Sequence, residues 1–370
     1  MNVIKVLIVD DSSVIRNIIR EALKGSDTIK VIGEAEDPLV ARELIKKLNP
    51  DVLTLDVEMP KMDGITFLTN LMRLRPMPVI MLSTLTTKGA DITLQALELG
   101  AVDFIAKPTV QELLATQASF KEILIEKLSQ AVTIDQKNFK LTDKLTTKKL
   151  PLENSHTLSF VGTKRANHLI AIGASTGGTE AIKKLLVTFP SNSPPIVITQ
   201  HIPKTFSHRF AQRLNEHCQV EVHEASHGQK IKEGHVYIAP GDKHLEIVSK
   251  NGTLFCTLSD GEEVNRHKPA VDVLFDSLRD IADNVQAILL TGMGQDGAQG
   301  MLRLKELGAR TIVQDKNSSL IWGMPGRAHA ISAHTEELPL VDISKSVLHY
   351  AALKRSEMQD LLEKSEGRSL

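Results

Sequence analysis

Short apolar runs alternate with amphipathic stretches over the first third of the chain. The runs have the length of buried strands, whereas the amphipathic stretches repeat apolar residues at helical spacing. The predicted strands cover residues 3–9, 31–35, 52–55, 79–82 and 104–106, and the predicted helices cover residues 14–24, 38–48, 65–74, 89–99 and 110–128. This strict alternation predicts a flavodoxin-like (βα)5 domain, with helices on both faces of a parallel sheet.

The alternation stops after residue 131, where Lys, Thr, Asp and Asn dominate and periodicity is weak. Such composition is typical of a linker. We therefore predict a first domain over residues 1–128, a linker over 129–166, a second domain over 167–354 and a charged tail over 355–370, which would form a frayed helix.

Strand-like runs return in the second half of the chain. They cover residues 168–172, 196–199, 236–239, 245–248, 254–257, 287–290 and 311–313, and helical periodicity covers residues 179–188 and 298–307. This order predicts a second α/β domain, doubly wound around a mostly parallel sheet. Asn251-Gly252 separates two of the runs and predicts a small antiparallel hairpin.

Composition narrows the classes of function. A length of 370 residues fits two domains. A formal net charge of -1 and an aromatic content of 4% argue against nucleic-acid binding. Cys218 and Cys256 are too few for a disulfide scaffold or a thiolate metal site. Because we find neither a membrane-length apolar run nor a signal peptide, we expect a cytoplasmic protein that does not insert into membranes.

Acidic and other polar side chains follow four of the predicted strands of the first domain. Asp10 and Asp11 follow the first strand, Asp56 the third, Ser83 the fourth and Lys107 the fifth. The carboxyl ends of parallel strands share one edge of the sheet, so three carboxylates would meet there and favour a divalent cation such as Mg²⁺. A simpler interpretation is that the residues at 10–13 only cap the next helix, but it leaves Asp56 and Lys107 unexplained.

These residues resemble the receiver domain of response regulators. The resemblance covers residues 1–128 and includes Asp10-Asp11, Met59-Pro60 and Asp63-Gly64 after Asp56, Ser83, and Lys107-Pro108. It implies that Asp56 accepts a phosphoryl group from a histidine kinase. It also implies a Mg²⁺ site on Asp11, Asp56 and a loop carbonyl near Glu58, with Asp10 beside them, and switch residues at Ser83, Phe104 and Lys107.

Ser175 carries the most specific motif of the second half. Gly173-Ala174-Ser175-Thr176-Gly177 lies between a predicted strand and a predicted helix, which is the pattern of a nucleophile elbow. A tight strand-to-helix connection or a phosphate-binding loop would give the same pattern. A serine nucleophile also needs a base and an acid that activate its hydroxyl.

His201 and Asp296 are the candidate base and acid. Each directly follows a predicted strand, as Ser175 does, so all three fall on one edge of one sheet. His267 is the alternative base and Asp242 the alternative acid. The chain order Ser, His, Asp differs from the Ser, Asp, His order of α/β-hydrolases, which excludes that fold.

A glycine pattern offers a competing interpretation. Gly292, Gly294 and Gly297 match the dinucleotide-binding fingerprint between a strand and a helix. Asp296 would then lie beside a pyrophosphate, where its negative charge is unfavourable. We therefore favour the triad over a nucleotide-binding domain.

Residues 168–350 resemble the catalytic domain of chemotaxis protein-glutamate methylesterases. The matching stretches are residues 172–180, 200–203, 237–244, 267–277, 291–298 and 323–325. The resemblance implies hydrolysis of glutamate γ-methyl esters on methyl-accepting chemoreceptors, with release of methanol, and deamidation of receptor glutamines. Ser175 would be the nucleophile, and we expect the oxyanion to be held by backbone N–H groups, without any cofactor, at Thr176, Met293 and Gly294. The alternative is a response regulator whose second domain only binds nucleotide or nucleic acid.

Overall fold

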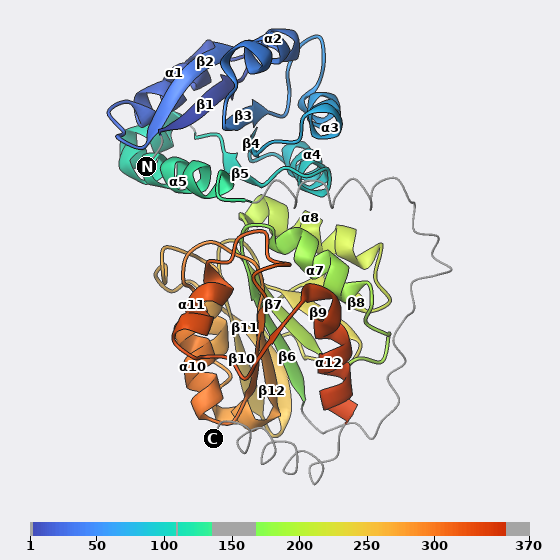
Figure 1. Cartoon of the computed structure of the whole chain (residues 1–370). Coiled ribbons are helices and arrows are strands. Elements are labelled where there is room, and N and C mark those ends of the chain that lie inside the picture. Colours follow the sequence, from blue (N-terminus) through green and yellow to red (C-terminus); the bar gives the residue numbers. More distant parts are fainter. Residues whose placement is uncertain (1–2, 109, 135–167, 353–370) are drawn as a thin grey trace, which may run out of the picture. The chain divides into compact units, whose positions relative to one another are not determined.

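The computed structural model describes residues 3–108, 110–134 and 168–352 (Figure 1). The chain divides into two compact units, Met1–Glu153 and Asn154–Leu370. Most of the predicted linker and the whole predicted tail lie outside the described residues. The fifth helix continues to Ala131, slightly beyond its predicted end.

The first unit contains a five-stranded parallel sheet in the order β2-β1-β3-β4-β5. This is the flavodoxin-like order, as predicted. The strands are β1 (Ile4–Val9), β2 (Ile29–Ala35), β3 (Val52–Asp56), β4 (Val79–Ser83) and β5 (Asp103–Ala106). The helices are α1 (Ser13–Leu23), α2 (Pro38–Leu48), α3 (Gly64–Leu74), α4 (Thr87–Glu98) and α5 (Val110–Ala131).

Polar side chains fix where the helices of the first unit begin. Ser12, Asp37, Asp63 and Thr86 each accept a hydrogen bond from a backbone N–H in the first turn of the helix that follows. Ser12 therefore caps α1, while Asp10 Oδ1 accepts from the Ser12 N–H, outside the helix, at 2.9 Å. Capping thus accounts for Ser12 and does not account for Asp10 or Asp56.

The second unit contains a seven-stranded sheet in the order β14-β13-β12-β6-β7-β9-β8, and every paired neighbour is parallel. Its strands are β6 (Leu169–Ala174), β7 (Ile196–Gln200), β8 (Glu221–Glu224), β9 (His235–Ile238), β12 (Val285–Leu289), β13 (Arg310–Gln314) and β14 (Glu336–Leu338). Strands β8 and β14 were not predicted. The doubly wound α/β class is confirmed.

Helices cover both faces of this sheet (Figure 1). One group packs together as α7 (Gly178–Leu186), α8 (Lys204–Asn215) and α12 (Leu340–Ala352), and the other as α9 (Val271–Asp276), α10 (Ala298–Glu306) and α11 (Met324–Ala330). A short 3-10 helix, η1 (Arg279–Asn284), follows α9. Within the described residues, we find no helix long and apolar enough to cross a membrane.

The predicted hairpin is present as β10 (His244–Lys250) and β11 (Thr253–Ser259), which pair antiparallel. Asn251 and Gly252 have φ angles of 50° and 74°, as a type I′ turn requires. Buried residues of this hairpin belong to the same core cluster as α9, α10 and α11. The hairpin therefore helps to close that face of the sheet.

The sheet changes its winding direction between β12 and β6. From β6 the chain passes to β7 on one side, and from β12 it passes to β13 on the other. In open α/β sheets, the carboxyl ends of the strands at such a switch point form the ligand-binding crevice. The fold thus places the loops after β6 and β12 at the position where a site is expected.

Candidate active site and phosphoryl-acceptor site

Ser175 lies between the end of β6 and the start of α7, and its backbone is held from two sides. Its N–H donates to the carbonyl of Thr291 at 3.1 Å, and its own carbonyl accepts from the N–H of Gly178 at 2.7 Å. The turn needs glycine because Gly177 has a φ angle of +75°, and a Cβ at Gly178 would lie 2.2 Å from Gln200 Oε1. The two glycines of this turn are therefore required by geometry.

His201 follows β7, the neighbour of β6. Its N–H donates to the carbonyl of Ala174 at 3.1 Å, and Gln200 Nε2 donates to the carbonyl of Ser175 at 2.9 Å. These bonds tie the residue after β7 to the turn after β6. Ser175 and His201 thus follow paired residues of two adjacent strands.

Asp296 is 1% exposed and holds the His201 ring. Its Oδ2 lies 2.8 Å from His201 Nε2 and also accepts from the Val271 N–H at 2.6 Å, while its Oδ1 accepts from Asn265 Nδ2 at 2.9 Å. Burial alone would raise the pKa of Asp296, but the hydrogen bonds from His201, Asn265 and Val271 lower it to about 2. The carboxylate is therefore ionised at neutral pH.

The contact with Asp296 selects the tautomer of His201. An ionised carboxylate only accepts, so Nε2 carries the hydrogen. Nδ1 is then the nitrogen that can take up a proton, and it is buried without a hydrogen-bond partner in the described part of the chain. The arrangement leaves His201 with one basic nitrogen available for a hydroxyl.

The structure places the two alternative residues differently. The ring of His267 stacks on that of His201, with centroids 3.6 Å apart and planes 16° apart. Asp242 instead forms an ion pair with Lys204 Nζ at 2.7 Å on the surface. His267 is therefore a neighbour of the candidate base, whereas Asp242 is engaged elsewhere.

The loop after β12 lies directly against Ser175. A Cβ at Gly292 would lie 2.9 Å from Ser175 Cβ and 2.3 Å from Met324 Sδ. The Gly292 carbonyl accepts from the N–H groups of Gly323 and Met324, which fixes the loop. Met293 and Gly294 follow in this loop, so the fold brings their backbone to the same side of the sheet as Ser175.

Internal packing explains two of the three fingerprint glycines. Gly292 makes room for Ser175, and a Cβ at Gly297 would lie 2.5 Å from Val271 Cγ1. Gly297 also has a φ angle of +83° and forms the N-cap of α10. Contacts within the protein thus account for Gly292 and Gly297 without a bound dinucleotide.

Asn265 is a residue of this site that no sequence motif indicated. Its Nδ2 donates to Asp272 Oδ2 at 2.7 Å and to Asp296 Oδ1 at 2.9 Å, so it joins two buried carboxylates. Burial, together with the charge of Asp296, raises the pKa of Asp272. No spacing rule links Asn265 to Asp296, and only the fold brings them together.

The first unit brings its predicted residues together at the carboxyl edge of its sheet. Lys107 Nζ lies 2.9 Å from Asp10 Oδ2 and 2.8 Å from Asp56 Oδ1. Oxygens of Asp10, Asp11 and Asp56 lie within 4.8 Å of one another. Burial, and then the charge of Asp10, raises the pKa of Asp56 to about 6 despite the lysine. Converging carboxylates of this kind suit a hard cation.

Three further predicted residues lie on strands of the same sheet or shortly after one of them. Buried Ser83 accepts from Thr93 Oγ1 at 2.7 Å. Phe104 is also buried, with Lys127 Nζ 5.8 Å from its ring centre. The Glu58 N–H donates to Asp56 Oδ1 at 3.3 Å, whereas the Glu58 carboxylate pairs with Lys88 Nζ at 3.1 Å. Glu58 therefore contacts Asp56 through the Glu58 backbone, not through its carboxylate.

Two family models match the chain. The model of the response regulator receiver domain matches residues 6–118, and that of the CheB methylesterase matches residues 170–347. The CheB methylesterase catalytic domain of Thermotoga maritima, a crystal structure, is 34% identical and has a TM-score of 0.49. It covers 51% of this chain and 100% of its own.

Curated relatives match over nearly the whole chain. A "protein-glutamate methylesterase/protein-glutamine glutaminase" of Hydrogenovibrio crunogenus is 47% identical over 94% of this chain and 99% of its own length. A "protein-glutamate methylesterase/protein-glutamine glutaminase 1" of Hahella chejuensis is 50% identical over 95% of this chain and 97% of its own. With a receiver domain followed by a CheB methylesterase domain, this chain belongs to the family of protein-glutamate methylesterases/protein-glutamine glutaminases, which are hydrolases.

Proposed function

We propose that this chain is a phosphorylation-regulated carboxylesterase that hydrolyses glutamate γ-methyl esters of methyl-accepting chemoreceptors in the cytoplasm and deamidates receptor glutamines. The observation that carries the proposal is the 2.8 Å contact between His201 Nε2 and buried Asp296, at the sheet edge that also presents Ser175. Relatives at 47–50% identity bear both activities in their names.

Ser175 Oγ attacks the ester carbonyl while His201 Nδ1 takes up its proton. The carbonyl oxygen becomes an oxyanion, and the backbone N–H groups of Thr176, Met293 and Gly294 donate to it. Collapse of the intermediate breaks the bond to the methoxy group, which leaves as methanol with the proton from His201. Each well-placed oxyanion donor contributes about 10² to 10³ in rate, and the base about 10² to 10⁴.

Water then completes the reaction. His201 takes a proton from the water, whose oxygen attacks the acyl-serine carbonyl, and the proton returns to Ser175 Oγ as it leaves. The products are one methanol and one glutamate side chain for each ester and water consumed. An amide substrate follows the same course and releases ammonia. Asp296 stabilises the charged imidazole throughout.

Asp56 is the proposed acceptor of a phosphoryl group from a chemotaxis histidine kinase. A carboxylate oxygen attacks phosphorus, and the kinase histidine leaves. Asp10, Asp11 and Asp56, with a carbonyl near Glu58, fit Mg²⁺ because they offer hard oxygen ligands. The ion, when bound, neutralises negative charge around the phosphoryl group. Lys107 supplies further positive charge to the same oxygens.

Ser83, Phe104 and Lys107 are the proposed switch residues of the receiver. Ser83 and Lys107 lie at the carboxyl edge of the same sheet as Asp56. In functional terms the receiver spans residues 1–128 and the esterase spans 167–354, with a linker over 129–166 and a tail over 355–370.

Release of methanol from methylated receptor membranes tests the esterase assignment. Ser175→Ala should abolish it, while Asp242→Asn should retain it because Asp242 pairs with Lys204 at the surface. Retained turnover in Ser175→Ala, with an unchanged melting temperature, would overturn the assignment of the nucleophile.

A further inference from the structure

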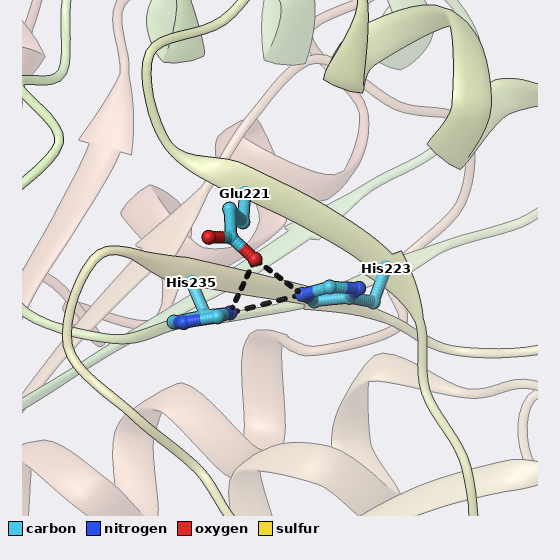
Figure 2. A group of neighbouring side chains, drawn as sticks. All are labelled: Glu221, His223 and His235. Atoms are coloured by element: carbon cyan, nitrogen blue, oxygen red, sulfur yellow. Dashed lines mark hydrogen bonds and ion pairs between the residues drawn. The ribbon is translucent and has the colours of Figure 1, made fainter.

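A second group of chemically capable side chains lies on β8 and β9. His223 Nε2 is 2.9 Å from His235 Nδ1, and Glu221 Oε2 is 3.8 Å and 3.6 Å from these two nitrogens (Figure 2). The proposed esterase and phosphoryl-transfer chemistry uses none of the three. Their three potential ligand atoms thus converge on one small triangle.

The parallel pairing of the two strands creates this triangle. Glu221 and His223 are two residues apart on β8, so their side chains emerge on the same face of the sheet. The register pairs Glu221 with His235 and His223 with Tyr237 on β9. All three candidate ligands therefore project from one face of two adjacent strands, as Figure 2 shows.

The spacing matches the ligands of a single ion. Two ligand atoms that each lie 2.0–2.1 Å from a tetrahedral ion are about 3.3 Å apart. The observed separations of 2.9, 3.6 and 3.8 Å bracket this value. The carboxylate oxygen is beyond hydrogen-bond distance from both nitrogens. The two imidazoles are within hydrogen-bond distance of each other, and the carboxylate lies at ion-pair distance from both of them.

Tyr237 supports the two imidazoles from one end. It is 1% exposed, and its ring centroid lies 5.8 Å from that of His223 and 6.2 Å from that of His235. Its hydroxyl accepts from the Lys232 N–H and donates to the Lys230 carbonyl, both at 3.0 Å. A fixed ring beside the histidines limits their rotamers, so less conformational entropy is lost when an ion binds.

We infer that Glu221, His223 and His235 bind a late first-row divalent cation such as Zn²⁺. Two imidazoles and one carboxylate are a donor set typical of such ions and differ from the all-oxygen set of the receiver. The side chain of Glu221 is 68% exposed, which leaves room for water at a fourth position. The ion would link β8, which ends the sheet order, to β9.

Zn²⁺ titration of the metal-free full chain in excess Mg²⁺ tests this inference, since Mg²⁺ occupies oxygen-ligand sites. A chromophoric chelator reports the equivalents bound, and the melting temperature reports stabilisation. His223→Gln should bind one equivalent fewer than the wild type, and Glu221→Gln should bind at least about tenfold more weakly. Zn²⁺ should raise the melting temperature of the wild type more than that of either variant.

His208→Gln is the matched control, because His208 pairs with one carboxylate, Glu224, at 3.4 Å in a simple ion pair. It should bind Zn²⁺ as the wild type does. Equal stoichiometry and affinity in wild type and Glu221→Gln would overturn the inference, as would an equal loss in His208→Gln. If His223→Gln fails to fold, the result for Glu221→Gln alone tests the inference. The Glu221 side chain is largely exposed, so this substitution should not prevent folding.

Discussion

The imidazole rings of His201 and His267 lie face to face, with centroids 3.6 Å apart. His201 also contacts buried Asp296, at 2.8 Å. The two histidines that the sequence offered as alternative bases therefore lie in one cluster, in which His201 is in contact with Asp296. His201 is the base in our account, and His267 is a positioning residue that limits the tilt of its ring.

The two histidines should respond differently to substitution. His201→Ala should lower kcat by about 10² to 10⁴, the usual contribution of a general base. His267→Ala should lower it by about 2- to 12-fold, because stacked rings contribute about 0.5–1.5 kcal/mol. Steady-state methanol release measures both. A larger loss in His267→Ala than in His201→Ala would reverse the assignment.

Asn265 should also act by positioning. Asn265→Ala removes the donor that joins Asp272 and Asp296, and hydrogen bonds to charged groups contribute about 1.5–3 kcal/mol. We expect kcat to fall by about 10- to 100-fold with KM nearly unchanged. Substitution of the exposed Glu262 by Gln is the control and should leave kcat unchanged. A change in KM alone would show that Asn265 contacts substrate instead.

Gly292 should tolerate no side chain. In Gly292→Ala the new Cβ would meet Met324 Sδ and Ser175 Cβ at 2.3 and 2.9 Å, so the turn that holds Ser175 must move. Overpacking of this kind costs about 1–3 kcal/mol, and we expect a lower melting temperature together with a large loss of kcat. Gly261→Ala is the control, since its nearest atom is at 3.4 Å. Equal activity of the two variants would refute the close approach.

Asp56 should make the stability of the receiver depend on pH. Its pKa is raised from 3.8 to about 6 in the folded protein, so protonation favours folding. The stabilisation from protonated Asp56 is fully present below the pKa that Asp56 has in the unfolded chain. It is lost as the pH rises through about 6. Asp56→Asn should therefore stabilise the receiver at pH 7.5 by on the order of 1–3 kcal/mol, and by less at pH 5.

Thermal unfolding without Mg²⁺ at the two pH values measures this difference. The exposed Asp27, substituted by Asn, is the control and should change stability equally at both. Mg²⁺ should stabilise the wild type more than Asp56→Asn, because it binds the ionised carboxylate. A gain that is the same at pH 5 and pH 7.5 would contradict the raised pKa of Asp56.

Strands could be predicted from the sequence where a run of apolar residues coincides with a buried strand of the structure. The fully buried strand β6 is a continuous apolar run, β12 contains a shorter one over residues 287–289, and Asn251-Gly252 located the hairpin. Strand β8 was missed because Glu221 and His223 interrupt its apolar pattern at the edge of the sheet. The helix α9 has only six residues, too few for a helical period to be evident.

The motif residues of the candidate site could be predicted from the sequence, whereas the groups that hold them in place could not. Ser175, His201 and Asp296 each follow a buried strand, so sheet topology alone places them on one edge. The Val271 N–H is a backbone group, which no residue type reveals, and Asn265 lies in a turn with a φ angle of 53°. Such contacts depend on how a loop returns to the sheet, which local sequence does not specify.

In the proposed function, the charge state of Asp56 controls hydrolysis at Ser175. Methanol release from methylated receptor membranes, with and without a small-molecule phosphodonor, tests it in wild type and Asp56→Asn. We predict that the donor accelerates the wild type and has no effect on Asp56→Asn, whose basal rate stays measurable. Equal acceleration of both proteins, or acceleration of neither, would contradict the account.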